Sequence, residues 1–204
     1  MSRLAFAAFA CTALAACAPS RSEQVARDVS IIAAEHKPDT LTQRGLAFAQ
    51  VGDMTRAEQY LVAALDTGAP AATILPKLLV VCIASSHYRA GIEYAAPELQ
   101  RDPENASLRF VVAELEALTG DTTAARGDLD KVTEAQPSEP APHFAYARLL
   151  RDEVGDRVAA DKEFRAYLRL APRGEHANEA RASLLKTVVA ENVLPDRPVE
   201  LSPQ

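Results

Sequence analysis

The sequence predicts an all-α protein made of repeated helical hairpins, and three observations support this prediction. Alanine is the commonest residue, tryptophan is absent and aromatic residues make up only 5% of the 204 residues, a composition that favours closely packed helices over a sheet. Prolines recur at intervals of 33, 34 and 35 residues, at Pro70, Pro103, Pro137 and Pro172. Gly-Asp pairs, which are typical of turns between helices, fall in register with them at Gly52-Asp53, Gly120-Asp121 and Gly155-Asp156.

The overall charge excludes some classes of partner. The chain has 22 basic and 28 acidic residues, with 48% apolar and 25% charged residues, which is the balance of an ordinary folded protein. General binders of nucleic acid or of anionic membranes need a basic surface. The net charge of −6 therefore argues against both, although it leaves a local basic patch open.

The first 16 residues have the pattern of a secretory signal. One cation, Arg3, precedes an apolar run from Leu4 to Ala16 that ends in small residues. The run is shorter than the about 20 residues that a membrane-spanning helix needs, so a retained transmembrane helix is the weaker alternative.

The tetrad that ends at Cys17 (Leu14-Ala15-Ala16-Cys17) resembles the bacterial lipobox. The resemblance implies cleavage before Cys17, a diacylglycerol on its thiol and a short tether at residues 17–22. Because Ala18 is not an inner-membrane retention aspartate, it also implies the periplasmic face of the outer membrane. The alternative is a plain cleavage site beside an incidental cysteine.

The period divides a helical domain at residues 23–194 into four units, about 38–70, 71–104, 105–138 and 139–173. In the second unit Ser86-His87 fills the Gly-Asp slot. Five residues after each slot a small residue recurs where two helices would approach closely, at Ala57, Gly91, Ala125 and Ala160. Apolar residues at helical spacing predict second helices over residues 55–67 and 158–170.

Further helices are expected at both ends of the repeats. Residues 20–36 read as a leading helix, and residues 175–193 as the helix of a C-terminal cap (174–194), which repeat stacks need. Residues 195–204 have no pattern and read as a loose tail. Pro97 falls inside a predicted helix, where we expect a kink; it either adjusts the shape locally or widens a groove.

These motifs resemble the tetratricopeptide repeat, a 34-residue helix-turn-helix. The best-matching residues of the first and fourth units are Leu41, Gly45, Phe48, Ala57, Leu61, Tyr146, Ala147, Gly155, Ala160, Phe164 and Leu168. The resemblance implies an alpha-alpha superhelix of right-handed twist. The chain departs from the pattern at Arg109 and Glu116, which occupy positions that are normally apolar, and by one extra residue near Glu153.

The resemblance also implies a concave groove lined by the first helix of each unit. The positions carried over are Thr42, Leu46, Ala49, Gln50, Pro76, Val80, Ile83, Ala84, Phe110, Glu114, Ala117, Leu118, Phe144, Arg148, Arg151 and Asp152. Apolar anchors fill the middle, with Arg148 and Arg151 as a cationic end. The alternative is that several of these residues pack between adjacent helices.

The residues offer no set for catalysis or for holding a metal ion. The histidines His36, His87, His143 and His176 lie in four sections without ligand spacing. There is no glycine-rich phosphate loop and no nucleophile turn. Cys82 stands in an apolar run and reads as a buried, inert thiol. We therefore expect no enzyme activity, cofactor, metal or small-molecule substrate.

By resemblance, the sequence predicts a non-catalytic, lipid-anchored periplasmic scaffold that binds protein. The expected partner is a subunit of an envelope machine, such as a pilus secretin, an outer-membrane assembly complex or a motility complex. The alternative is an adaptor or regulator of a peptidoglycan-modifying enzyme. Self-association through the open ends of the stack fits the same features.

Overall fold

The computed structural model describes residues 36–186, which form a series of α-helices joined by short turns, without a strand. In chain order the elements are α2 (Pro38–Gln50), α3 (Met54–Asp66), α4 (Ala71–Ala84), α5 (Tyr88–Arg101), α6 (Ala106–Thr119), α7 (Thr122–Ala135), α8 (Pro140–Leu149), the π-helical turn η1 (Leu150–Val154), α9 (Arg157–Leu170) and α10 (Ala177–Ser183). The predicted signal peptide, Cys17, the tether, residues 20–35 of the leading helix and the tail lie outside the described residues.

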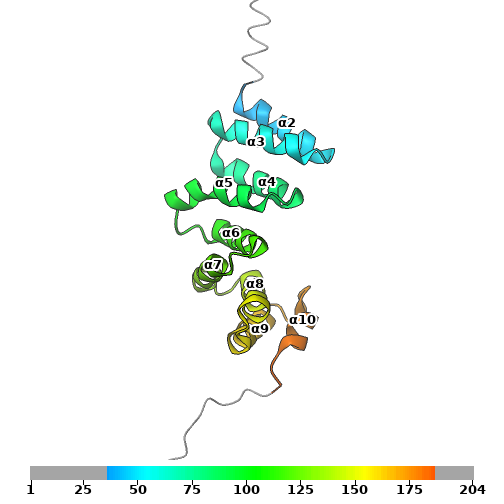
Figure 1. Ribbon diagram of the computed structural model, residues 1–204, viewed down its shortest axis with the longest axis vertical. Helices are drawn as coiled ribbons and strands as arrows, with labels where there is room; N and C mark the ends of the chain where they lie inside the picture. The colour runs from blue at the N-terminus through cyan, green and yellow to red at the C-terminus, as the bar shows by residue number, and fades with distance from the viewer. Residues whose placement is uncertain (1–35, 187–204) are drawn as a thin grey trace, which may run out of the picture.

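The helices pair into four antiparallel hairpins that stack in one column (Figure 1). The substantial contacts among the described helices join neighbours or next-but-one neighbours along the chain. In Figure 1, α2 to α5 run across the view, whereas α7 to α9 are seen nearly end-on, so the hairpins turn about the long axis of the stack. The prediction of an all-α repeat superhelix is therefore confirmed.

The Gly-Asp pairs form the turns for two separate physical reasons. Gly52, Gly120 and Gly155 have φ near +80°, a left-handed conformation that glycine adopts at little cost. The aspartate that follows each glycine caps the next helix, as when Asp53 Oδ1 accepts the Arg56 N–H at 3.0 Å. The second hairpin keeps the turn without these residues, because Ser86 has φ 60° and His87 makes no side-chain cap.

The small residues mark close contacts between helices, as the sequence predicts. Ala57, Ala125 and Ala160 are buried. Gly91 is also buried, and a β-carbon added to it would lie 2.9 Å from Leu115 Cδ1. A side chain in this slot would force Leu115 to shift, and Cys82 and Leu79 of α4 lie only 3.4 Å away.

The core is divided along the column into three clusters. The first joins α2 and α3 to α4 through residues such as Leu61 and Leu78. The second joins α4 and α5 to α6 around Leu115, and the third runs from α6 to α10 around Phe164. Each cluster therefore holds adjacent hairpins together, as in other helical repeat stacks.

The described residues after Ser183 differ from the sequence prediction of a helix over residues 175–193. Helix α10, the last one within residues 36–186, ends at Ser183, ten residues before the predicted end, and Leu184 is extended. The Asp161 carboxylate accepts a hydrogen bond from the Leu185 N–H at 2.8 Å, and Leu184 packs on the third core cluster. These contacts hold the chain in a non-helical path that the apolar pattern alone did not reveal.

Pro97 does not interrupt its helix. Helix α5 continues through it from Tyr88 to Arg101, and the proline lies on the exposed side. The Glu93 carbonyl that loses its N–H donor can be hydrated there, which limits the cost. Within residues 36–186, no helix is both long and apolar enough to cross a bilayer.

Candidate interaction surface

We call the surface formed by α2, α4, α6 and α8 the first-helix face, since these are the first helices of the four hairpins. Three aliphatic side chains are exposed on two of these helices: Val80 (64%) and Ile83 (43%) on α4, and Leu118 (54%) on α6. They belong to the groove positions implied by the resemblance. The structure therefore leaves apolar side chains on this face, where they are available to a partner.

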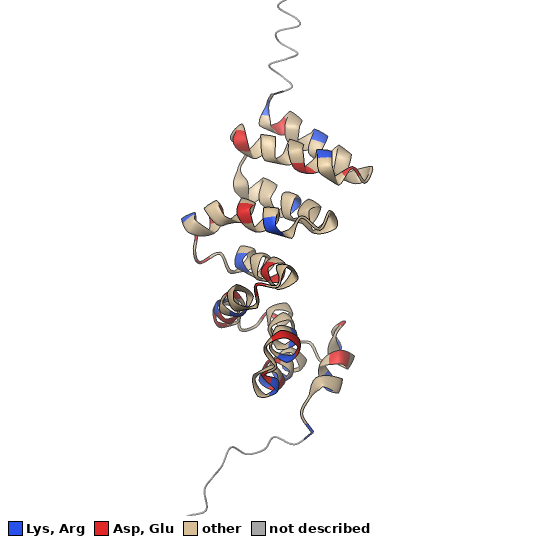
Figure 2. Cartoon of the chain, viewed as in Figure 1, with Lys and Arg blue, Asp and Glu red and all other residues tan. Residues whose placement is uncertain are grey.

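Helix α4 is apolar on both sides, which explains the exposure of Val80 and Ile83. Its only charged residue is Lys77, so the helix is almost entirely tan in Figure 2. One side packs Ile74 and Leu78 in the first core cluster, while the other side meets solvent. A helix of a monomer ordinarily carries polar residues on its outer side, so the outer side of α4 is suited to burial against another molecule.

Among the other groove positions of the first three hairpins, Pro76 and Ala84 on α4 are exposed, whereas most of those on α2 and α6 are less open. In α2, Leu46 is half-buried and Gln50 is exposed. In α6, Phe110 is half-buried and packs against the third core cluster, and Glu114 is half-buried. The most open apolar part of the first-helix face therefore lies on α4 and at the end of α6.

Phe144 is not a groove residue, and its sequence-based assignment is wrong. The side chain is 5% exposed. Its ring stacks on His176 with centroids 4.1 Å apart and packs against Phe164 and Tyr167. His176 immediately precedes α10, so the chain that leads into this helix covers Phe144 and makes it part of the core.

Arg151 is also withdrawn from the predicted cationic end of the groove. Its guanidinium donates to Ser183 Oγ at 2.5 Å and to Glu179 Oε1 at 3.0 Å, both on α10. It also binds Asp152 and lies over the Phe164 ring. The contacts with α10 therefore engage Arg151, while Arg148 on α8 remains exposed.

A pocket of about 230 Å³ lies between α6 and the α8–η1 segment. Its apolar walls come from Ala117, Leu118, Leu129, Ala145 and Leu149, and its charged walls from Glu114, Arg148, Asp152 and Glu153. The groove positions implied by the resemblance include most of these wall residues but not Glu153. The extra residue of the fourth unit was the available signal, because η1 accommodates an insertion at this place.

Leu118 connects this pocket with a second hollow. That hollow, of about 510 Å³, lies between the α4–α5 turn and the end of α6 and is lined by Ser86–Ala90, Leu118 and Thr119. Because Leu118 lines both, the two hollows adjoin at this residue. We call them together the depression; its walls come from the second, third and fourth hairpins.

The carboxyl of Glu114 has no hydrogen bond or close ion pair within the described residues. Burial raises its pKa above the usual value, and the charge of Arg148 offsets this shift only in part. Asp152 differs, because its hydrogen bonds to Arg151 lower its pKa. Glu114 therefore brings to the pocket wall a carboxyl group that has no hydrogen bond among the described residues and is only partly compensated by the charge of Arg148.

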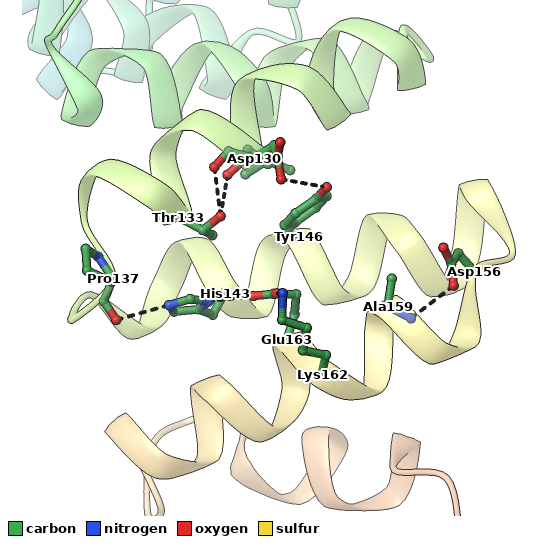
Figure 3. Close-up of polar contacts among 10 residues, drawn as sticks. Asp130, Thr133, Pro137, His143, Tyr146, Asp156, Ala159, Lys162 and Glu163 are labelled. Carbon is green, nitrogen blue, oxygen red and sulfur yellow. Dashed lines mark hydrogen bonds and ion pairs between the residues drawn. The ribbon is translucent and has the colours of Figure 1, made fainter. Parts of the chain in front are cut away.

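Other buried polar groups hold helices together. His143 Nδ1 lies 2.6 Å from Glu163 Oε2, and its Nε2 lies 3.2 Å from the Pro137 carbonyl oxygen (Figure 3). Tyr146 donates to Asp130 Oδ1 at 3.3 Å. These contacts connect α8 to α9 and to α7, so His143 has a packing role that the sequence did not reveal.

The remaining candidates for chemistry form no site in the described part of the chain. Cys82 is fully buried, and burial raises its thiol pKa to about 12, so it is protonated and unreactive at neutral pH. No group of three or more metal-ligating side chains comes together among residues 36–186. The depression contains the exposed Leu118 and several of the groove positions implied by the resemblance, which makes it the candidate binding site.

No family model matches the sequence, and no curated protein matches it. Several solved structures have the same fold. A tetratricopeptide repeat protein from Parabacteroides merdae ATCC 43184 matches with a TM-score of 0.64 and 18% identity over 72% of this chain. The match spans 58% of that protein's length.

Two smaller proteins match over most of their length. YrrB, a tetratricopeptide repeat protein described as having an unusual peptide-binding site, gives a TM-score of 0.65 and 14% identity over 79% of this chain and 85% of its own. MamA from Desulfovibrio magneticus RS-1, from residue 41 to its end, matches with a TM-score of 0.60 and 15% identity. The match covers 78% of this chain and 99% of the MamA chain. The chain therefore has the fold of tetratricopeptide repeat proteins.

Proposed function

We propose that this chain is a non-catalytic scaffold that binds a segment of another protein on its first-helix face. The observation that carries the proposal is the exposure of Val80, Ile83 and Leu118 on this face, together with the two hollows that adjoin at Leu118. Full burial of an aliphatic side chain contributes about 1.5–3 kcal/mol, so covering these residues would favour association. The peptide-binding site of YrrB, which has the same fold, favours a peptide segment as the ligand.

The proposed location rests on the first 17 residues. The lipobox-like Leu14–Cys17 tetrad supports a lipid on Cys17 and a place at the periplasmic face of the outer membrane. The partner is then a subunit of an envelope machine, such as a pilus secretin, an outer-membrane assembly complex or a motility complex. A peptidoglycan-modifying enzyme is the alternative partner.

Photocrosslinking in the native cell tests the surface. A photoreactive amino acid is placed at Val80 or Leu118, and at Val158 as the control, because Val158 is 72% exposed but lies on the second-helix side in α9. We expect a discrete crosslinked protein from the first two positions and not from Val158, with mass spectrometry separating machine subunits from wall enzymes. Equal crosslinking of the same protein from Val158 would overturn the assignment of the face.

A Cys17→Ser arm of the same experiment tests the location. We expect this variant to lose both the envelope membrane fraction and the crosslink, while Cys11→Ser, a matched change within the predicted signal, keeps them. A Cys17→Ser protein that remains in the membrane and crosslinks normally would contradict the lipid tether but leave the binding face intact.

A further inference from the structure

The α6–α8 pocket has the size of a site for one side chain. Its volume of about 230 Å³ is below the about 300–1,000 Å³ of ordinary small-molecule sites. Five apolar residues form much of its wall, and one of them, Leu118, also lines the larger hollow at the α4–α5 turn. A peptide that lies along the depression could therefore place one long side chain in this pocket.

The charges of the pocket favour a cation. Asp152 is already paired with Arg151, with bonds of 2.6 and 2.9 Å. Of the remaining charged walls, Glu114 and Glu153 outnumber Arg148. Arg148 is exposed and forms no salt bridge with Glu114, although its charge acts on that carboxyl group, so a cation of a partner can approach the carboxyl group.

The environment of Glu114 points to the same ligand. A half-buried carboxylate without a donor carries a desolvation cost, and this cost appears as the raised pKa of Glu114. A lysine or arginine side chain would supply charge-assisted hydrogen bonds, which are about twice as strong as neutral ones. Its aliphatic stem would pack on the apolar wall.

We propose that the first-helix face binds a peptide segment in which apolar residues lie beside a lysine or arginine, and that this basic side chain enters the α6–α8 pocket and pairs with Glu114. This inference rests on the proposed function and specifies the chemistry of its ligand. The proposal reverses the sequence-based expectation that this end of the groove is cationic. Arg151 is bound to α10, whereas the acidic residues Glu114 of α6 and Glu153 of η1 line the pocket.

The test begins with random dodecapeptides displayed on phage and selected on the full chain. The selected peptide is synthesised with its basic residue and also with norleucine, an uncharged side chain of similar length, in that place. Binding is measured by fluorescence anisotropy to the wild type, Glu114→Gln, Arg148→Ala and the control Glu134→Gln, which changes an exposed glutamate of α7 outside the depression. Leu118→Gln identifies peptides that bind the depression.

We expect selected peptides to carry lysine or arginine next to apolar residues. Glu114→Gln should weaken binding of the basic peptide about tenfold and leave the norleucine peptide unaffected. Arg148→Ala should strengthen binding severalfold, because it removes a competing cation, and Glu134→Gln should change neither peptide. Weaker binding in high salt is expected for the basic peptide only.

The failures of the two proposals are distinguishable. Peptides that lose binding in Leu118→Gln but bind equally well with norleucine would overturn the cation pairing and leave the scaffold function standing. Acidic peptides that depend on Arg148 would also overturn the pairing. If no selected peptide depends on Leu118, both proposals fail. Because the norleucine comparison needs no change in the protein, it holds even if a variant folds poorly.

Discussion

Glu116 occupies a repeat position that is ordinarily apolar, and its surroundings satisfy it poorly. Its Oε2 atom is buried without a hydrogen-bond partner. Burial and the charges of Asp128 and Asp121 raise its pKa to about 7. Arg109, the other unusual residue of this unit, instead pairs with Asp128 at 2.8 Å. Of the two polar residues at normally apolar positions of the third hairpin, Arg109 therefore has an ion-pair partner, whereas the carboxyl group of Glu116 has an unsatisfied buried oxygen.

We predict that Glu116→Gln stabilises the protein at pH 8. Because the pKa in the folded state is higher than in the unfolded state, the stability that this group contributes falls as pH rises from about 4.5 to about 7. The gain at pH 8, reduced for partial solvent screening, is about 1 kcal/mol. Urea unfolding at pH 8 and pH 4 measures it, with Glu134→Gln as the control.

The difference in unfolding free energy between Glu116→Gln and the wild type should be smaller at pH 4, because Glu116 is then protonated in the native protein and largely protonated in the unfolded chain. A constant difference between Glu116→Gln and the wild type at both pH values would show that titration of Glu116 is not the cause.

At the scale of single elements, the turn slot shows how the same backbone arises from different residues. Three turns use glycine followed by a capping aspartate, whereas Ser86 in the second hairpin holds φ 60° with a side chain. The left-handed conformation costs an L-residue about 1–2 kcal/mol. The fold of the hairpin therefore imposes this turn on residues that do not favour it.

Ser86→Gly should stabilise the protein by about 0.5–1 kcal/mol, as the relief of left-handed strain exceeds the entropy lost by a more flexible unfolded chain. The matched control is Ser107→Gly within helix α6, where glycine should lower stability. Thermal unfolding of both variants measures the two shifts. If Ser86→Gly destabilised the protein, the stability contributed by the Ser86 side chain would exceed the cost of its left-handed backbone conformation.

The elements were predictable where local rules decide them. Apolar periodicity predicts second helices at residues 55–67 and 158–170, and the structure has α3 at Met54–Asp66 and α9 at Arg157–Leu170. The groove was less predictable. Phe144 and Arg151 would be accessible to a partner only if the chain around α10 did not pack on them. Where that chain packs follows from contacts between residues that are distant in the sequence. Glu153 depends on how one inserted residue is absorbed by η1.

At the scale of the whole molecule, stability is distributed along the column. The first core cluster contains α2 to α4, and the third contains α6 to α10. A defect in one cluster therefore acts mainly on the hairpins that share it, because each repeat contacts only its neighbours.

Phe144→Ala should destabilise the fourth hairpin by about 3–5 kcal/mol, the usual cost of removing a buried aromatic ring. Hydrogen exchange measured by mass spectrometry should show faster exchange in α8, α9 and α10 and unchanged rates in α2 and α3. Leu118→Ala, at an exposed position on the same face, should change stability by no more than about 0.5 kcal/mol.

A uniform loss of protection over all helices would show that the described region unfolds as one cooperative unit. If Phe144→Ala exchanged like the wild type, the assignment of the Phe144 ring to the core would be contradicted.

The division of the core into separate clusters also determines how the molecule responds to mechanical load. Tension applied between its two ends would pass through the inter-hairpin contacts in series, since no cluster spans the column. Small rotations between adjacent hairpins would add up, so the described stack would lengthen reversibly before any hairpin unfolded.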